Sequence, residues 1–390
     1  MRVLMDYRAA LRERSGVGEY THQLARALIA ACRRNGSDRP LDLTVFSSSW
    51  KDRFVPSAEL AGATAIDRRV PVSLLNFAWH RLNWPPAEAL TGRTFDVTHS
   101  LHPLLLPSKM AARVVTIHDL NFLAHPERTR AEVRRDYPSL ARDHARRADA
   151  IVTVSEFTAR EIVEKLGVPR SRISVCLPGA PDWAPRSKAP STGYVLFLGT
   201  LEPRKNVGGL LDAWERLVAG GFEPTDGPVA RAFQASVPDL VLAGKATEES
   251  RSWLARLERP PLQGRVRHVG YVHPENRREL YEGARLLVQP SLEEGFGMPV
   301  LEAMTAGVPV VAADRGALPE VLGDAGLLVD PNRPDRIADA IVQILNDDAL
   351  AAACVSRGLA RSREFRWDRT ARGVYTAYMK AIENRRCASA

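Results

Sequence analysis

The stretch from Ser291 to Asp314 reads SLEEGFGMPVLEAMTAGVPVVAAD and predicts a loop, a helix and a strand in that order. Pro299 suits the first turn of a helix, where its missing N–H group has no partner to lose. Gly307 stands where glycine commonly ends a helix, and Pro309 prevents the helix from continuing. The apolar run 308–313 then predicts a buried strand.

Two carboxylates flank the beginning of this helix. Glu294 falls in the preceding loop and Glu302 about one turn inside the helix. Between them, the backbone N–H groups of Gly295, Phe296, Gly297 and Met298 lie where the helix dipole is positive. The two carboxylates can accept hydrogen bonds from hydroxyl groups, and the helix start attracts anions. Together they suit a ligand that is both polyhydroxylated and phosphorylated. A nucleotide sugar is such a ligand.

Length and composition describe an ordinary soluble protein with two domains. The chain has 390 residues, of which 45% are hydrophobic and 26% charged. No apolar run approaches the roughly 20 residues that span a bilayer, and the N-terminus lacks the apolar core of a signal peptide. The four cysteines show no metal or redox spacing, which predicts reduced thiols and a cytoplasmic location. They are Cys32, Cys176, Cys354 and Cys387.

The positive charge lies mainly in the first half of the chain. Residues 1–185 hold 27 Lys and Arg against 20 Asp and Glu, out of a formal net charge of +8. This excess would attract an anionic partner, such as the inner face of a membrane or a lipid diphosphate. Arginines on solvated faces explain the charge equally well. Nucleic acid is disfavoured, because no recognition motif accompanies the charge.

Both halves alternate short apolar runs with helical patterns, which predicts an α/β protein with two doubly wound parallel sheets. Strands are predicted at 2–5, 43–46, 97–98, 114–117 and 150–154, and then at 194–198, 240–243, 266–269, 286–289, 308–313 and 327–329. Residues 181–193 are rich in Pro, Gly and Ser, as linkers are. Such sheets bind ligands at the carboxyl ends of their strands, so we expect a cleft there between the two domains.

Several motifs in this order resemble the retaining glycosyltransferases of family 4, which have the GT-B fold. The motifs are SGVGEY, TIHDLNFLAHPE, ADAIVTVSEFTARE, FLGTLEPRKNVGGLLDAW, GYV, PSLEEGFGMPVLEAMTAGVPVV and FRWDRTARGVYTAY. The resemblance implies a Rossmann-like acceptor domain at 1–180 and a Rossmann-like nucleotide-sugar donor domain at 194–365. It also implies a C-terminal helix, 366–390, that packs back on the first domain.

The resemblance assigns a role to each carboxylate and to the adjacent cations. Glu302 would accept hydrogen bonds from the ribose and Glu294 from hydroxyls of the transferred sugar. The alternative is two solvated glutamates near a helix start. Arg204 and Lys205, in the loop after strand 194–198, would neutralise the diphosphate as charge develops on it, unless they belong to an ordinary basic loop. Because no two aspartates are separated by a single residue, we expect no metal cofactor.

Glycines and a histidine complete the predicted donor site. Gly16 and Gly18 stand near the start of the first helix, where they would let the backbone approach phosphate or sugar, as their position after the first strand matches the family. An ordinary tight turn is the alternative. Gly199 is predicted to line the donor site. His118, followed by Asp119 at the end of strand 114–117, would contact the sugar and support developing positive charge. A structural histidine and a general base are the alternatives.

Further predictions concern a turn, an arginine-rich stretch and two tryptophans. Tyr271 and Val272 would contact the nucleotide base through their backbone, or would simply pack in a core turn. Seven arginines between 128 and 147 indicate a solvated helix face or an acceptor or membrane patch, with Trp79 and Trp84 as interfacial anchors. The arginines are Arg128, Arg130, Arg134, Arg135, Arg142, Arg146 and Arg147.

The resemblance as a whole implies a glycosyltransferase that transfers a hexose with retention, by front-face displacement. The form IHDLNFLAHPE of the histidine motif, together with SGVGEY, most resembles mannosyltransferases that use GDP-mannose. UDP- and dTDP-sugar donors stay open, as does a nucleotide-sugar epimerase. A lipid-linked glycan, a growing polysaccharide and a small molecule are all compatible acceptors.

Overall fold

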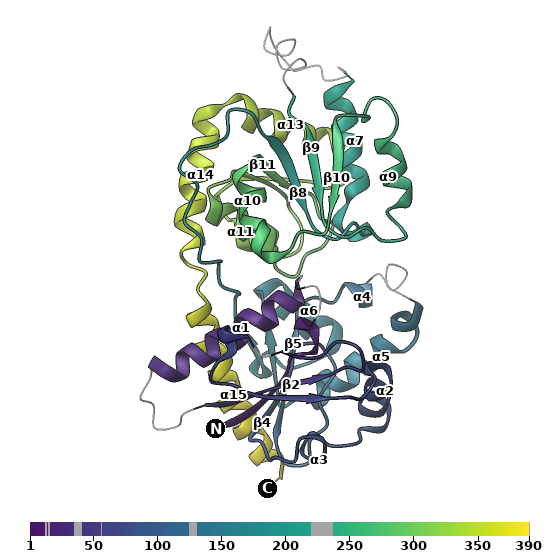
Figure 1. The fold of residues 1–390 in the computed structure, drawn as a ribbon, viewed down its shortest axis with the longest axis vertical. Helices are drawn as coiled ribbons and strands as arrows, with labels where there is room; N and C mark the ends of the chain where they lie inside the picture. Colours follow the sequence, from purple (N-terminus) through teal and green to yellow (C-terminus); the bar gives the residue numbers. More distant parts are fainter. Residues whose placement is uncertain are drawn as a thin grey trace. The chain divides into compact units, whose positions relative to one another are not determined.

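The chain folds into two compact α/β units in the computed structural model (Figure 1). The structure describes residues 1–11, 14, 16–34, 41–55, 57–124, 131–219 and 237–389, without the side chains of 32–34, 124, 131–136, 388 and 389. One unit comprises Met1–Gly179 together with Phe365–Ala390, and the other comprises Ala180–Glu364. The C-terminal segment therefore belongs to the first unit, and the Pro-rich segment 181–193 belongs to the second.

The first unit is built on a seven-stranded parallel sheet of order β3-β2-β1-β4-β5-β6-β7. Its strands are β1 (Arg2–Asp6), β2 (Asp42–Ser48), β3 (Thr64–Arg68), β4 (Val97–Ser100), β5 (Ala112–Ile117), β6 (Ala150–Thr153) and β7 (Ile173–Val175). The sequence predicts five of these but not β3 or β7. Strand β3 lies at the sheet edge without a fully buried residue, and β7 is only three residues long, so neither shows a clear apolar run.

The helices of the first unit include one from the far end of the chain. They are α1 (Val17–Arg34), α2 (Val72–Leu82), α3 (Ala87–Thr91), α4 (Asn121–Ala124), α5 (Ala131–Arg147), α6 (Glu156–Leu166) and α15 (Trp367–Ser389). Helix α15 packs against α1 and along β4–β7. Within this packing the buried Tyr378 hydroxyl lies 2.8 Å from His99 Nδ1, and Thr370 Oγ1 donates to Leu177 O at 2.6 Å.

The second unit contains a six-stranded parallel sheet of order β10-β9-β8-β11-β12-β13. The strands are β8 (Tyr194–Leu198), β9 (Leu240–Ala243), β10 (Val266–Gly270), β11 (Ala284–Gln289), β12 (Val310–Ala313) and β13 (Leu327–Val329). All six were predicted, but β12 begins two residues later than expected. Val308 N instead donates to Ala303 O at 2.9 Å, closing the preceding helix, and Pro309 has no N–H group to donate.

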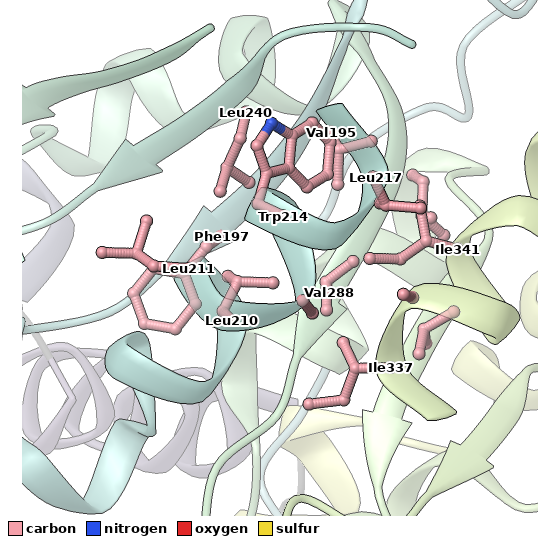
Figure 2. Packing of buried hydrophobic residues seen from close by; sticks show 14 of the residues in the cluster. Val195, Phe197, Leu210, Leu211, Trp214, Leu217, Leu240, Val288, Ile337 and Ile341 are labelled. Carbon is pink, nitrogen blue, oxygen red and sulfur yellow. The ribbon is translucent and has the colours of Figure 1, made fainter. Parts of the chain in front are cut away.

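Helices of the second unit cover a continuous apolar core. They are α7 (Val207–Val218), α9 (Arg251–Leu257), α10 (Arg277–Glu282), α11 (Met298–Ala306), α12 (Leu318–Leu322), α13 (Pro334–Asn346) and α14 (Asp348–Ser362). Figure 2 shows Trp214, Leu210 and Leu217 of α7 among residues of the sheet and of α13. This packing fixes the sheet whose carboxyl edge carries the candidate site.

The helix predicted around Glu302 is confirmed as α11. Pro299 lies in its first turn, and Gly307 ends it with φ +75°. Gly297, immediately before the helix, has φ +107°, and a Cβ atom there would lie 2.6 Å from Leu318 Cδ2. Because L-residues rarely adopt this backbone conformation, glycine satisfies both the dihedral angle and the close packing. The loop 291–297 is thereby held tightly between β11 and α11.

Candidate functional site

The candidate site of the second unit lies where its strand order reverses. Strand β8 is followed in sequence by β9 and β10 on one side, while β11 pairs with β8 on the other. In open α/β sheets, ligands bind outside the carboxyl ends of the strands at such a point. After β8 comes the short 3₁₀ helix Pro203–Lys205, and after β11 comes the loop that carries Glu294.

Lys205 and Glu294 form a buried ion pair at this edge. Lys205 Nζ donates to Glu294 Oε1 at 2.5 Å. The same oxygen accepts from Ser291 Oγ at 2.8 Å and from Gln289 Nε2 at 3.1 Å. Three donors from β8 and β11 and their loops therefore converge on one carboxylate oxygen and fix its position.

Arg204 lies beside this pair and is more exposed. Its Nη1 is 3.4 Å from Glu294 Oε2, and its Nε is 2.7 Å from Glu202 Oε1. The side chain of Arg204 is 24% exposed, compared with 10% for Lys205. The backbone carbonyl of Arg204 also accepts from Leu292 N at 2.8 Å, so the two loops are joined through main chain as well as side chains.

The cationic side chains of the cluster favour the ionised form of Glu294. Burial by itself raises the pKa of Glu294, but the nearby Lys205 and Arg204, together with hydrogen bonds, outweigh burial and lower the pKa to about 2. Burial lowers the pKa of Lys205, as does the adjacent Arg204, while Glu294 opposes both effects. Glu294 is thus ionised at neutral pH, and two cationic side chains surround it.

Glycines bring the backbone close around this cluster. A Cβ atom on Gly316 would lie 2.6 Å from Glu294 O and 2.7 Å from Glu294 N. A Cβ atom on Gly244 would lie only 1.9 Å from Gly199 O, whereas one on Gly199 would make ordinary contact with the Lys205 side chain at 3.7 Å. Gly316 and Gly244 have no room for a larger residue, and neither was predicted from the sequence.

Glu302 is also buried, and residues of α10 hold it. Its Oε1 accepts from Arg277 Nη1 at 3.1 Å, and its Oε2 accepts from Tyr281 Oη at 2.9 Å. Tyr281 is completely buried, and its burial raises the pKa of its hydroxyl far above the ordinary value. Glu302 is therefore oriented through both oxygens, and the sequence gave no indication of Arg277 and Tyr281 as its partners.

The other predicted donor residues of the second unit lie in its loops and at the start of α11. Gly295, Phe296 and Gly297 are buried, and Met298 is half-buried. Tyr271 and Val272 follow β10, where Gly270 has φ +74° and the Tyr271 ring packs edge-on against His273 at 4.9 Å between ring centroids. The residues 295–298 therefore lie between β11 and the first turn of α11, and Tyr271 and Val272 lie after the end of β10.

His118 lies just beyond the carboxyl end of β5 in the first unit. The ring packs edge-on against Tyr20, with 4.8 Å between centroids, and its Nε2 is 3.2 Å from Leu101 O. The carbonyl of His118 accepts from Thr158 Oγ1 of α6 at 3.2 Å. Burial lowers the pKa of His118 to about 4, so the imidazole is neutral at pH 7.

The two glycines of SGVGEY lie at the start of α1, with Gly16 immediately before the helix. Gly16 has φ +49° and its carbonyl accepts from Tyr20 N at 3.0 Å. Gly18 lies inside the helix and is buried. Ser155 caps α6: its Oγ accepts from Thr158 N at 3.1 Å.

Sequence reasoning missed a charged cluster at the strand reversal of the first unit, between β1 and β4. Asp6 closes β1 and accepts both Nε and Nη2 of Arg8 at 2.9 and 2.7 Å. His102 Nε2, after β4, is 3.5 Å from Asp6 Oδ2. Burial raises the pKa of Asp6, but Arg8 and His102 lower it well below its usual range. The only sequence signal is a charged residue at the end of an apolar strand.

The prediction that Trp79 anchors the protein at an interface is wrong. Trp79 is completely buried, and its Nε1 donates to Pro85 O at 3.0 Å. The indole ring packs in the core of the first unit, with its centroid 5.5 Å from that of the Phe46 ring. Trp84, in contrast, is 65% exposed.

The arginine-rich stretch is described only in part. Arg128 and Arg130 lie outside the described residues, as do the side chains of Arg134 and Arg135. On α5, Arg142 and Arg146 are exposed and Arg147 pairs with Asp143 at 2.8 Å, as on a solvated helix face.

Two kinds of feature are absent from the described part of the chain. No three His, Cys, Asp or Glu side chains gather there as ligands for a metal ion. None of the helices in the described ranges is long and apolar enough to cross a membrane.

Comparison with protein-family models decides the family. Residues 14–181 match the model "Glycosyltransferase Family 4", and residues 192–347 match "Glycosyl transferases group 1". The O-antigen chain mannosyltransferase B of Escherichia coli is 35% identical over 313 residues, which are 77% of this chain and 78% of the relative. The chain belongs to glycosyltransferase family 4.

Further relatives of this family 4 chain include enzymes with different names. The D-inositol 3-phosphate glycosyltransferase of Acidothermus cellulolyticus is 28% identical, covering 96% of this chain and 87% of the relative. The phosphatidyl-myo-inositol mannosyltransferase of Mycolicibacterium smegmatis is 29% identical, covering 73% and 71%. The protein is therefore a glycosyltransferase, and several of its relatives are mannosyltransferases.

Solved structures share the fold of this glycosyltransferase. A sucrose-phosphate synthase from Thermosynechococcus elongatus has a TM-score of 0.75 at 20% identity, covering 97% of this chain and 98% of that one. WaaG, a glycosyltransferase involved in lipopolysaccharide biosynthesis, has a TM-score of 0.68 at 15% identity, covering 97% and 98%. The predicted GT-B class with two parallel-sheet Rossmann-like units is thereby confirmed.

Proposed function

We propose that this glycosyltransferase transfers mannose from GDP-mannose to an acceptor hydroxyl, with retention at the anomeric carbon. The observation that carries the proposal is the cluster of Arg204, Lys205 and Glu294 at the strand reversal of the second unit. Relatives named as mannosyltransferases support the choice of sugar. Among them, the enzyme with 35% identity matches this chain over most of its own length.

In the second unit, cationic side chains would bind the diphosphate of the donor, a carboxylate the ribose, and backbone groups the base. Arg204 and Lys205 would neutralise the diphosphate, Arg204 from its more exposed position. Arg277 and Tyr281 orient the two oxygens of the Glu302 carboxylate, which would accept hydrogen bonds from ribose hydroxyls. Backbone around Tyr271 and Val272 would contact the base.

Front-face displacement requires no enzymatic nucleophile. The bond from the anomeric carbon to the diphosphate oxygen breaks, and the acceptor oxygen forms its bond on the same face of the sugar. The acceptor proton passes to the departing diphosphate oxygen. Arg204 and Lys205 would stabilise the charge on that diphosphate, and Glu294 would hold sugar hydroxyls. From the first unit, neutral His118 would support the developing positive charge; this role is proposed from the family resemblance.

Calorimetric titration with GDP, UDP and dTDP tests the nucleotide directly. We expect GDP to bind most tightly, and tightest binding of UDP would overturn the preference for GDP-mannose. Release of nucleotide from each donor in the presence of candidate acceptors then tests the sugar. Retention is tested by NMR of the product, because an α-linked donor must give an α-linkage. A β-linkage would exclude the proposed mechanism.

A UDP-sugar is the second candidate donor, because a solved structure with the same fold is described as a complex with UDP and glucose. That protein is 16% identical to this chain and shares its fold with a TM-score of 0.68. An epimerase is distinguished by incubation with donor alone, since it would change the sugar without any acceptor.

We further propose that the donor binds without a metal cofactor. The two cations beside Glu294 supply the positive charge that a divalent ion would otherwise bring to the diphosphate. Activity should be unchanged after incubation with EDTA and gel filtration. Loss of activity that Mg²⁺ or Mn²⁺ restores would contradict this proposal.

A further inference from the structure

Helix α2 of the first unit is apolar on two opposite sides, and only one side is covered. Leu75 and Trp79 are buried and pack into the core of this unit. On the outward side, Leu74 and Phe77 are each 58% exposed and Leu82 is 61% exposed. An ordinary surface helix carries polar residues on the side away from its core, so the outward side of α2 departs from that pattern.

The exposed apolar residues form one continuous feature. At 100° per residue, Leu74, Phe77 and Arg81 fall within about 60° of one another around the helix, and Leu82 lies about 80° from Leu74, at the margin of this side. Trp84 follows directly after the helix and is 65% exposed. We call Leu74, Phe77, Arg81, Leu82 and Trp84 the outer face of α2. Scattered apolar residues on a surface are normal, but a concentration like this indicates an interaction site.

The charge around the outer face is positive. Arg81 lies on the face itself, and Arg68 and Arg69 precede the helix and are exposed. The sequence contains no Asp or Glu from position 68 to position 87. Arg147 of α5 also reaches the end of α2, where its Nη2 donates to Asn83 Oδ1 at 3.3 Å. Because Asp143 pairs with Arg147, the positive charge near the outer face rests on Arg68, Arg69 and Arg81. The partner that complements this surface is therefore both apolar and anionic.

We propose that the outer face of α2 docks on the surface of a bilayer that contains anionic phospholipids. Leucine, phenylalanine and tryptophan side chains would enter the boundary between headgroups and acyl chains, while the arginines contact lipid phosphates. A second copy of the chain fits less well, because a two-fold contact through this face would bring each Arg81 toward the other. The inference goes beyond the proposed sugar transfer and requires neither the donor nor the acceptor.

Co-sedimentation of the full chain with vesicles tests the proposal. We expect binding to vesicles of phosphatidylglycerol and phosphatidylcholine, with much weaker binding to phosphatidylcholine alone and at high salt. Leu74→Ser and Phe77→Ser should each lower the vesicle-binding constant about tenfold, since each removes an apolar side chain from the interface. Arg81→Gln should weaken binding at low salt in particular.

The matched control is Leu328→Ser, which removes an exposed leucine from the second unit, where Leu328 is 38% exposed. This variant should bind vesicles like the wild type. Circular dichroism and thermal unfolding establish that each variant is folded. A second readout is quenching of tryptophan fluorescence by brominated lipids, which should decrease in Trp84→Phe.

Two outcomes would overturn the proposal. One is wild-type vesicle binding by folded Leu74→Ser and Phe77→Ser variants, which would place any lipid contact elsewhere. The other is no vesicle binding by the folded wild type at low salt. A dimer in solution that the same substitutions dissociate would then identify a second copy as the partner. Failure of the GDP-mannose assay leaves vesicle binding unaffected, so the two proposals are tested separately.

Discussion

Lys205 Nζ and Glu294 Oε1 lie 2.5 Å apart at the carboxyl edge of the second sheet, and both side chains are buried. Serine and glutamine donors occupy the same carboxylate oxygen, so the pair is enclosed by hydrogen bonds. A buried ion pair is costly to break because the remaining charge stays buried without its partner. We therefore expect substitutions in this cluster to lower the stability of the second unit as well as its activity.

Glu294→Gln should destabilise the second unit by about 3 to 5 kcal/mol, the usual cost of removing one partner from a buried pair. The amide keeps the size of the side chain but removes the charge that compensates Lys205 and Arg204. Glu202→Gln is the control, because Glu202 also pairs with Arg204 but its side chain is 30% exposed. That change should cost at most about 1 kcal/mol. Urea unfolding measures both, and equal costs would contradict the argument.

The same carboxylate predicts a specific loss of stability in acid. The pKa of Glu294 falls from an ordinary value of 4.5 to about 2 in the folded protein, so the unfolded chain takes up the proton first. Its stabilising contribution is complete above pH 4.5 and is lost as the pH falls toward 2. The contribution is on the order of 3 kcal/mol. The difference in unfolding free energy between wild type and Glu294→Gln should therefore shrink over that range, and a constant difference would exclude this linkage.

The sequence predicted the framework of this site but not its internal contacts. Pro299 and Gly307 mark the ends of α11 through local backbone chemistry, which a sequence carries directly. Gly316 and Tyr281 could not be found in this way. Their importance depends on contacts with Glu294 and Glu302 that exist only after the chain has folded. The same applies to Trp79, whose inward direction is set by the packing of α2 and not by its residue type.

Tyr281→Phe should remove one hydrogen bond to Glu302 while keeping the aromatic ring that packs beside it. The substitution removes the hydroxyl that donates to Glu302 Oε2 at 2.9 Å and should cost about 1 to 3 kcal/mol in stability. If Glu302 contacts the ribose, the KM for the donor should rise while kcat changes little. Tyr194→Phe is the control, because its hydroxyl donates to the backbone carbonyl of Leu280. A change in donor KM of the same size in both variants would argue against a positioning role for Tyr281.

His118 should remain neutral throughout the physiological pH range. Burial lowers its pKa to about 4, which an NMR titration of the imidazole in the intact protein can measure. The pH profile of kcat/KM should then show no limb from His118 between about pH 5 and 8. His118→Asn should lower the activity by a similar factor at every pH in this range. A limb near pH 6.5 that disappears in the variant would instead indicate a general acid or base.

Gly316→Ala tests whether the backbone of Glu294 needs the space that glycine leaves. The new Cβ atom would lie 2.6 Å from Glu294 O and 2.7 Å from Glu294 N, so the loop must shift. Gly264→Ala provides the matched control. Gly316 and Gly264 have φ values of +63° and +74°, but a Cβ atom on Gly264 meets nothing within 4 Å.

Both substitutions should carry a similar cost of about 1 to 2 kcal/mol from the left-handed backbone conformation. Only Gly316→Ala should carry the additional cost of displacing Glu294. It should also lower kcat/KM tenfold or more, because a group that positions the substrate would be misplaced. Urea unfolding separates the two costs, and nucleotide release reports the activity. If both variants lose stability equally and keep their activity, the close approach of Gly316 does not hold Glu294 in place.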